Sequence, residues 1–188
     1  MFWAVACHPP EGSDTAAVAQ DDSADDSGDA DDDARVRALA GLPAGTDACA
    51  VPVLGRVVHV VDGDTAWVQP EDGSAELNTR FIGVDTPEVA HDEPAECYGD
   101  VAAAFTESNL GGRLVWLTFD KDCLDPYDRT LAYVFRDDTD AGFFNRRLAR
   151  GGYAYDLSIA PNDSFEDEIH ADERAARDEG LGLWGACR

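Results

Sequence analysis

Two short stretches of this chain place oxygen-bearing side chains directly after strand-like runs. The first is Asp-Gly-Asp-Thr at residues 62–65, and the second is Val-Asp-Thr-Pro-Glu at residues 84–88. Carboxylate and carbonyl oxygens are the ligands that a hard cation such as Ca²⁺ prefers. Taken singly, Asp-Gly-Asp in so acidic a chain is typical of a solvated hairpin turn. Because both stretches end strands of one predicted meander, together they indicate a cation site.

Two arginines stand in unusual surroundings for a charged side chain. Arg80 lies in an apolar strand-like run, and Arg129 lies in a turn just before another such run. A guanidinium group binds phosphate through two parallel hydrogen bonds and keeps its charge. Taken singly, each arginine would ordinarily form a salt bridge to one of the many carboxylates. Facing one cation site, the pair would instead form a clamp for a pentavalent phosphate.

The elements that must position these residues begin with a three-stranded meander. β-Branched runs are separated by the turns Asp62-Gly63 and Asp72-Gly73-Ser74, which is a hairpin pattern. Two further strand-like runs follow later in the chain. The predicted strands are residues 53–61, 65–68, 77–84, 114–119 and 130–135.

Three helices are predicted between and after these strands. The first begins at Gly99 and is closed by Gly111-Gly112, and the second covers residues 144–150. The third begins at the N-cap Ser164, carries acids in its first turn and ends at Gly180. Five strands and three helices predict an α+β fold, a small closed barrel of the five-stranded oligonucleotide-binding type with helices packed on it.

The order and spacing of the motifs resemble the staphylococcal nuclease (thermonuclease) family. The resemblance covers about residues 53–184 and implies a Ca²⁺-dependent phosphodiesterase on an oligonucleotide-binding-type barrel, acting on DNA and/or RNA with little sequence preference. The matching stretches are Val-Asp-Gly-Asp-Thr at 61–65, Arg-Phe-Ile-Gly-Val-Asp-Thr-Pro-Glu at 80–88, Tyr-Gly at 98–99, Asp-Pro-Tyr-Asp-Arg-Thr-Leu-Ala-Tyr at 125–133, residues 145–151 and Leu-Gly-Leu-Trp at 181–184.

The resemblance implies a role for each acid of the two stretches. Asp64 and Asp85 look like carboxylate ligands of Ca²⁺, and the main-chain carbonyl of Thr86 looks like a further ligand. Glu88 falls where the family holds the attacking water, as its general base or its organiser.

The resemblance also implies the residues that contact the substrate. Arg80 and Arg129 correspond to the two arginines that contact the phosphate, and Arg129 is also placed to stabilise the leaving oxygen. Tyr127 corresponds to a tyrosine that lines the nucleotide pocket. Asp128 stands where the family usually has a glycine, so we expect an altered turn or a contact with Arg129.

A rival function is a barrel without catalysis that binds nucleic acid or Ca²⁺. Such modules typically lose the acids or the arginines, whereas all five chemical side chains are present here (Asp64, Arg80, Asp85, Glu88 and Arg129). We therefore expect an enzyme, acting as a monomer. The sequence leaves open whether it prefers DNA or RNA and whether it cuts internally or from an end.

The composition excludes a basic protein that coats nucleic acid. The chain holds 39 Asp and Glu against 14 Lys and Arg, a formal net charge of −25, and its one lysine is Lys121. An acidic surface nearly free of lysine is typical of a halophilic protein, because molar salt shortens the screening length to about 3 Å and mutes self-repulsion. The alternative is an ordinary acidic protein.

Residues 1–48 differ in composition from residues 49–188, which we assign to the nuclease domain. The run at residues 20–33 is rich in Asp, Ser, Ala and Gly and predicts a disordered, solvated tether. The apolar residues before Cys7 resemble the end of a lipoprotein signal, in which Cys7 would be acylated. A membrane contact would then come only from that lipid anchor; the alternative is a cytoplasmic chain with an unmodified Cys7.

The remaining four cysteines form no Cys-x-x-Cys pair, so a zinc site is not expected. Four cysteines allow three pairings; Cys49 and Cys187 bracket the folded body, and Cys97 and Cys123 flank one helix and one strand. Two disulfides paired in that way would fit an exported protein, either extracellular or attached to the cell surface. Four buried free thiols are the alternative.

Overall fold

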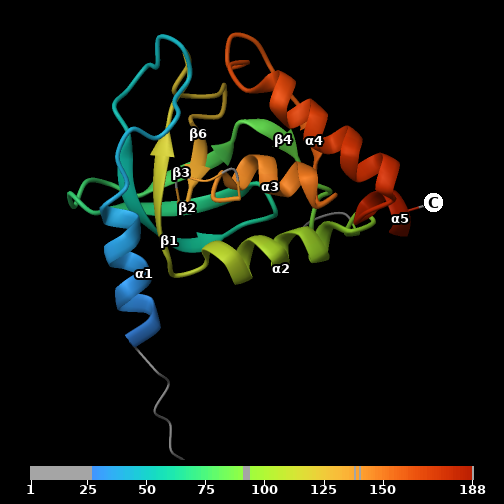
Figure 1. Ribbon diagram of the computed structural model, residues 1–188, viewed down its shortest axis with the longest axis horizontal. Coiled ribbons are helices and arrows are strands. Elements are labelled where there is room, and N and C mark those ends of the chain that lie inside the picture. The colour runs from blue at the N-terminus through green and yellow to red at the C-terminus, as the bar shows by residue number, and fades with distance from the viewer. Residues whose placement is uncertain (1–26, 91–93, 138, 140, 188) are drawn as a thin grey trace, which may run out of the picture.

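The computed structural model describes residues 27–187 apart from 91–93, 138 and 140. Five strands close a barrel in the order β1-β2-β3-β6-β5, and helices pack around it (Figure 1). The strands are β1 (Val53–Val60), β2 (Thr65–Pro70), β3 (Leu77–Phe81), β5 (Leu114–Thr118) and β6 (Thr130–Phe135). The predicted α+β barrel is confirmed.

The meander forms because its β-branched runs fit a pleated surface and its turns are short. β1, β2 and β3 pair antiparallel, and β3 then pairs in parallel with β6, so that Arg80 lies opposite Leu131. This parallel pairing closes the barrel and brings the end of β3 beside the start of β6.

The predicted strand 77–84 divides in two. β3 ends at Phe81, and β4 (Gly83–Asp85) pairs with β7 (Tyr155–Leu157) outside the barrel. Gly83 makes the change of direction with φ of 81°, and a Cβ there would come within 2.5 Å of the Ile169 side chain. The glycine therefore permits both the left-handed conformation and the close packing of the last long helix.

Three helices lie where they were predicted. These are α2 (Gly99–Leu110), α3 (Phe144–Arg150) and α4 (Glu166–Glu179), and the described chain adds α1 (Ser27–Arg37) and the short α5 (Leu183–Ala186). Figure 1 shows α1 and α4 on opposite sides of the barrel. None of the described helices is long and apolar enough to cross a membrane.

α3 is anchored in the core beside the strands that carry the arginines. Phe144 packs edge-on against Phe81, with their ring centroids 6.2 Å apart. The buried amide of Asn145 accepts a hydrogen bond from Val134 N and donates one to Ile82 O, at 2.9 and 2.8 Å. This bridge fixes the segment that follows β3 against β6.

Ser164 is not the N-cap of α4. The residue at that position is Phe165, and no side chain caps the helix. The Ser164 hydroxyl instead donates to Asp120 Oδ1 at 2.9 Å, and Asp120 is fully buried. A buried carboxylate requires hydrogen-bond donors, and that requirement outweighs the local preference for a cap.

The predicted pairing of the cysteines is wrong. Cys49 bonds to Cys123 and Cys97 bonds to Cys187, although all four predicted cysteines do form disulfides. The first bond joins the start of the body to the loop after β5, and the second joins the segment before α2 to the end of α5. The expected pairs do not form because the barrel brings Cys49 to the β5–β6 loop, while the C-terminus lies near α2.

The tether differs from expectation in its described part. Asp32 and Asp33, which we expected in a solvated spacer, lie in α1 and pair with arginines of the barrel. A carboxylate that pairs with a fixed guanidinium group forms charge-assisted hydrogen bonds, and these offset its loss of hydration. Residues 1–26, including Cys7, lie outside the described residues, so lipid attachment and the domain boundary stay predictions.

Candidate functional site

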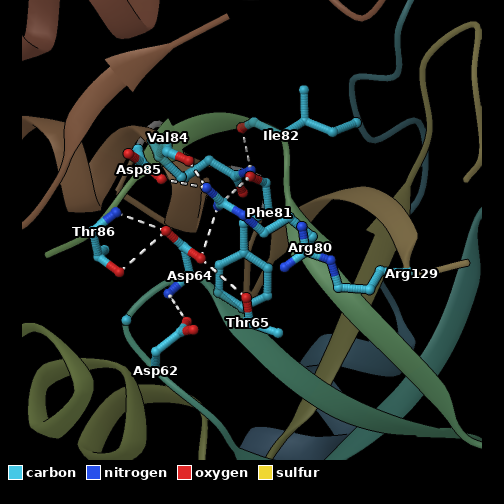
Figure 2. Close-up of polar contacts among 12 residues, drawn as sticks. Asp62, Asp64, Thr65, Arg80, Phe81, Ile82, Val84, Asp85, Thr86 and Arg129 are labelled. Atoms are coloured by element: carbon cyan, nitrogen blue, oxygen red, sulfur yellow. Dashed lines mark hydrogen bonds and ion pairs between the residues drawn. The ribbon is translucent and has the colours of Figure 1, made fainter. Parts of the chain in front are cut away.

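Asp64 is the buried centre of the site and ends the turn between β1 and β2. The side chain of Asp62 shapes that turn by accepting a hydrogen bond from Asp64 N at 3.0 Å. The Oδ2 atom of Asp64 accepts from the backbone N–H of Thr86 at 2.6 Å and from its hydroxyl at 3.1 Å (Figure 2). The two predicted stretches are thus joined directly through Asp64 and Thr86.

Arg80 joins the same two stretches from β3. Its Nη1 lies 2.8 Å from Asp64 Oδ1, and its Nη2 lies 2.7 Å from Asp85 Oδ1. Nη1 also donates to the carbonyl of Val84 at 2.7 Å. The two predicted metal ligands therefore converge on one guanidinium group, which Figure 2 shows between them.

The carboxylates around Asp64 carry more negative charge than the neighbouring Arg80 balances. Burial raises the pKa of Asp64 to about 7, the nearby Asp62 raises it further, and Arg80 and the Thr86 N–H lower it only in part. Burial also raises the pKa of Glu88, as do the charges of Asp62 and Asp85. A group of carboxylates whose pKa values rise in this way favours the arrival of a cation.

The oxygen atoms at this site suit a hard cation for which the protein supplies only some of the ligands. Asp64 and Asp85 supply carboxylate oxygens, and Asp64 is only 4% exposed. The part of the chain that the structure describes contains no cluster of three or more His, Cys, Asp or Glu side chains that could hold a metal. Main-chain carbonyls and water would complete the six to eight oxygens that Ca²⁺ takes.

A cleft of about 550 Å³ connects the acids to the second arginine. Arg80, Asp85 and Glu88 line it, and so do Tyr127 and Arg129. Tyr127 is 81% exposed, and the Arg129 guanidinium lies 5.7 Å from the centre of its ring. The fold brings the predicted substrate-binding residues into one cleft, with Asp64 and Thr86 buried beneath Arg80 and Asp85.

Asp125 holds Arg129 in the loop before β6. Its Oδ2 accepts from Arg129 Nε at 2.6 Å, and its Oδ1 accepts from the backbone N–H groups of Arg129 and Tyr127. Partial burial would raise the pKa of Asp125, but these hydrogen bonds outweigh burial and hold the pKa below its usual value. The charge and the hydrogen bonds of Asp125 therefore hold Arg129 in place in the loop.

Asp128 has a backbone conformation that glycine adopts readily. Its φ is 62°, in the left-handed region that Asp tolerates better than most residues. The hydrogen bonds of the Arg129 side chain within the described chain go to Asp125 and not to Asp128. The expected contact of Asp128 with the Arg129 side chain is not found among the described residues, and an altered turn stays a prediction.

Sequence reasoning missed three residues that position the site. Asp125 stands four residues before Arg129, a spacing that could have revealed the pair. Glu96 accepts from the backbone N–H of Glu88 at 3.1 Å. Thr106 of α2 is fully buried and donates to the carbonyl of Gly63 at 2.6 Å, a contact across 43 residues that no local pattern signals.

Both disulfides attach to loops of the cleft. Cys123 directly precedes the loop that carries Asp125, Tyr127 and Arg129, and Cys97 follows the segment that carries Glu88. The carbonyl of Cys123 also accepts from Leu131 N at 2.9 Å. Covalent bonds thus restrain two of the segments that border the cleft.

Comparison with known proteins finds nucleases among the relatives of this chain. A family model described as staphylococcal nuclease homologue matches residues 78–186. A thermonuclease of Staphylococcus intermedius is 39% identical over 129 residues, 68% of this chain and 74% of that protein. A thermonuclease of Staphylococcus hyicus is 38% identical over 130 residues, 69% of this chain and 74% of that protein. An uncharacterised endonuclease of Escherichia coli is 28% identical over 130 residues, 69% of this chain and 76% of that protein.

Proposed function

Because the chain belongs to the staphylococcal nuclease family, we propose that it is a Ca²⁺-dependent nuclease that hydrolyses phosphodiester bonds of DNA and RNA with little sequence preference. One observation carries the proposal. A single cleft holds two arginines, a carboxylate with a raised pKa and, beside them, two converging acids. Those are the groups that phosphodiester hydrolysis requires.

The arginines bind and orient the phosphate in this proposal. Arg129 meets Asp125 through Nε, and its terminal nitrogens are the atoms that would bind phosphate oxygens. Arg80 lines the same cleft, and its guanidinium group, which meets Asp64 and Asp85 in this structure, would add a second contact to the phosphate. Fixed forks stabilise the negative charge that grows in the transition state, without reorganisation during the reaction.

Glu88 holds the attacking water or accepts its proton. Burial and neighbouring acids raise the pKa of Glu88, so its carboxylate is a stronger base than an exposed glutamate. Asp64, Asp85 and the Thr86 carbonyl are the residues that would hold Ca²⁺, which when bound neutralises phosphate charge as a Lewis acid.

Cleavage of labelled DNA and RNA, with added Ca²⁺ and with excess chelator, tests the proposal. We expect internal cleavage with Ca²⁺ and none after chelation, and we expect Glu88→Gln to lower turnover while oligonucleotide binding is retained. Equal activity in chelator would show that the metal assignment is wrong. Binding without any cleavage would favour a non-catalytic module.

We also propose that the protein acts outside the cytoplasm and in high salt. Two disulfides support the first point, because such bonds persist in oxidising compartments. A formal net charge of −25 with a single lysine supports the second.

A further inference from the structure

Helix α1 is attached to the barrel mainly through charge. Asp32 Oδ2 lies 2.8 Å from Arg136 Nη2 and 3.2 Å from Arg113 Nη1. Asp33 Oδ2 lies 2.6 Å from Arg56 Nη2. Two consecutive carboxylates of α1 therefore meet three arginines of the barrel.

The attachment of α1 has little apolar support. Val36 is the buried apolar side chain at its end, and the Val36 carbonyl accepts from Trp116 Nε1 at 2.7 Å. An isolated helix of eleven residues is marginal in water. Partly exposed ion pairs each contribute only about 0–1 kcal/mol. The docked position of α1 is thus one that a competing anion can displace.

The three arginines form a prepared surface, here named the arginine surface (Arg56, Arg113 and Arg136). Arg56 Nη1 donates to the carbonyl of Gly112 at 2.8 Å, and Arg136 Nη1 donates to the carbonyl of Asn109 at 3.1 Å. These bonds fix the guanidinium groups of Arg56 and Arg136, whose other terminal nitrogens meet the carboxylates of α1. The surface is therefore held by the barrel and by the end of α2 and not by the helix that covers it.

Positive charge continues beyond the arginine surface. A cleft of about 400 Å³ beside α1 is lined by Arg35, Arg136 and Arg147, together with Asp32 and Asp137. The Arg147 guanidinium lies 5.2 Å from the ring centre of Phe105. Among the described residues, no carboxylate is a partner of Arg147. A surplus of arginine in so acidic a chain points to an anionic ligand.

The arginine surface and the catalytic cleft lie at opposite ends of one strand. Arg129 directly precedes β6 and Arg136 directly follows it. Six residues of strand span about 20 Å, a distance that roughly six nucleotides of a duplex strand cover. One nucleic acid molecule has the length to contact both.

We propose that the arginine surface is a second contact surface for the phosphodiester backbone of a nucleic acid, and that α1 covers it with Asp32 and Asp33 in place of phosphates. The choice of nucleic acid as the polyanion rests on the proposed function. Binding of a strand to the arginine surface displaces α1, and the carboxylates of α1 lower the affinity of the resting protein.

Equilibrium binding by the full chain tests this competition without turnover. The probe is a fluorescent single-stranded oligonucleotide of about 25 nucleotides, long enough to span both surfaces, in excess chelator at several salt concentrations. The variant Asp32→Asn/Asp33→Asn removes the covering charges. Its matched control is Asp167→Asn/Asp178→Asn, which removes two exposed carboxylates of α4.

We expect Asp32→Asn/Asp33→Asn to bind at least threefold more tightly than the control variant. We also expect a steeper salt dependence, because each added phosphate contact releases counterions with a slope of about −0.7 for a single strand. Adding Arg56→Gln/Arg113→Gln should remove the gain. Both arginines are more than a third exposed, so the fold should persist, and thermal unfolding checks it.

Two results would overturn the inference. One is equal affinity of the Asp32→Asn/Asp33→Asn variant and its control for the oligonucleotide. The other is a gain in affinity that persists when Arg56→Gln/Arg113→Gln is added. Hydrogen exchange gives a second readout, because amides of α1 should exchange faster once the oligonucleotide is bound. Cleavage assays run in parallel separate this inference from the proposed function, since arginine-dependent binding without cleavage would contradict the function alone.

Discussion

The carboxylate of Asp125 binds Arg129 twice, at the backbone N–H over 2.9 Å and at Nε over 2.6 Å. One side chain therefore fixes both the loop and the direction of the guanidinium group. We predict that Asp125→Asn lowers kcat about tenfold with little change in KM, because the charge-assisted bond to Nε weakens. Steady-state kinetics on an oligonucleotide measures the effect. A change in KM alone, with kcat unchanged, would contradict this prediction.

The same residue predicts a dependence of stability on pH. The pKa of Asp125 is lowered in the folded protein, so its contribution is present above its unfolded pKa of about 3.9 and is lost as pH falls through the folded pKa. Asp125→Asn should thus be less stable than the parent at neutral pH, and the difference should disappear in strong acid. Urea unfolding at a series of pH values measures this. A difference in stability between the variant and the parent that grows as pH falls would contradict the prediction.

Replacing either arginine of the cleft by lysine should remove most of the activity. We predict that Arg80→Lys and Arg129→Lys each lower turnover by roughly a hundredfold or more, because a point charge cannot replace a bidentate fork. The matched control is Arg174→Lys on the exposed face of α4. Circular dichroism checks that the fold is retained. Turnover near that of the parent in either variant would disprove the clamp.

The disulfides should make the protein sensitive to reduction. They join residues 74 and 90 positions apart, and loop-closure entropy assigns each about 4.5 kcal/mol of stability. We predict that Cys49→Ser/Cys123→Ser and Cys97→Ser/Cys187→Ser each lower the free energy of unfolding by a large part of that amount. Loss of the Cys49–Cys123 bond should also lower kcat, because Cys123 borders the loop of Arg129. Denaturant unfolding that is unchanged by reductant would contradict the prediction.

Salt should raise the activity, in contrast to a nuclease that depends on a basic surface. Residues 49–188 carry a formal charge of −16, which repels a polyanion in dilute buffer. Added salt screens that repulsion and leaves the short-range contacts of the two arginines. We predict that cleavage increases from tens of millimolar toward molar NaCl or KCl, with circular dichroism recorded beside the assay. A steady loss of activity in a protein that stays folded would show that the halophilic interpretation is mistaken.

The strands and three of the helices were predictable because each is encoded locally. Alternating β-branched residues identify β1 and β2, glycines end the helices, and the motifs around Asp64, Asp85 and Arg129 keep their order and spacing. The spacing of Asp125 and Arg129 was equally visible in the sequence, but the contact between the two side chains depends on the turn between them.

Long-range contacts decided the rest. Contacts between residues well separated in the chain include the ion pair of Arg80 with Asp64, the bond from Thr106 to Gly63, the pairing of Cys49 with Cys123 and the docking of α1. Local periodicity carries no information about such partners. Closure of the barrel brings these groups together, and once they are buried or fixed, their charges and hydrogen-bonding atoms must be satisfied by whatever neighbours the closure supplies.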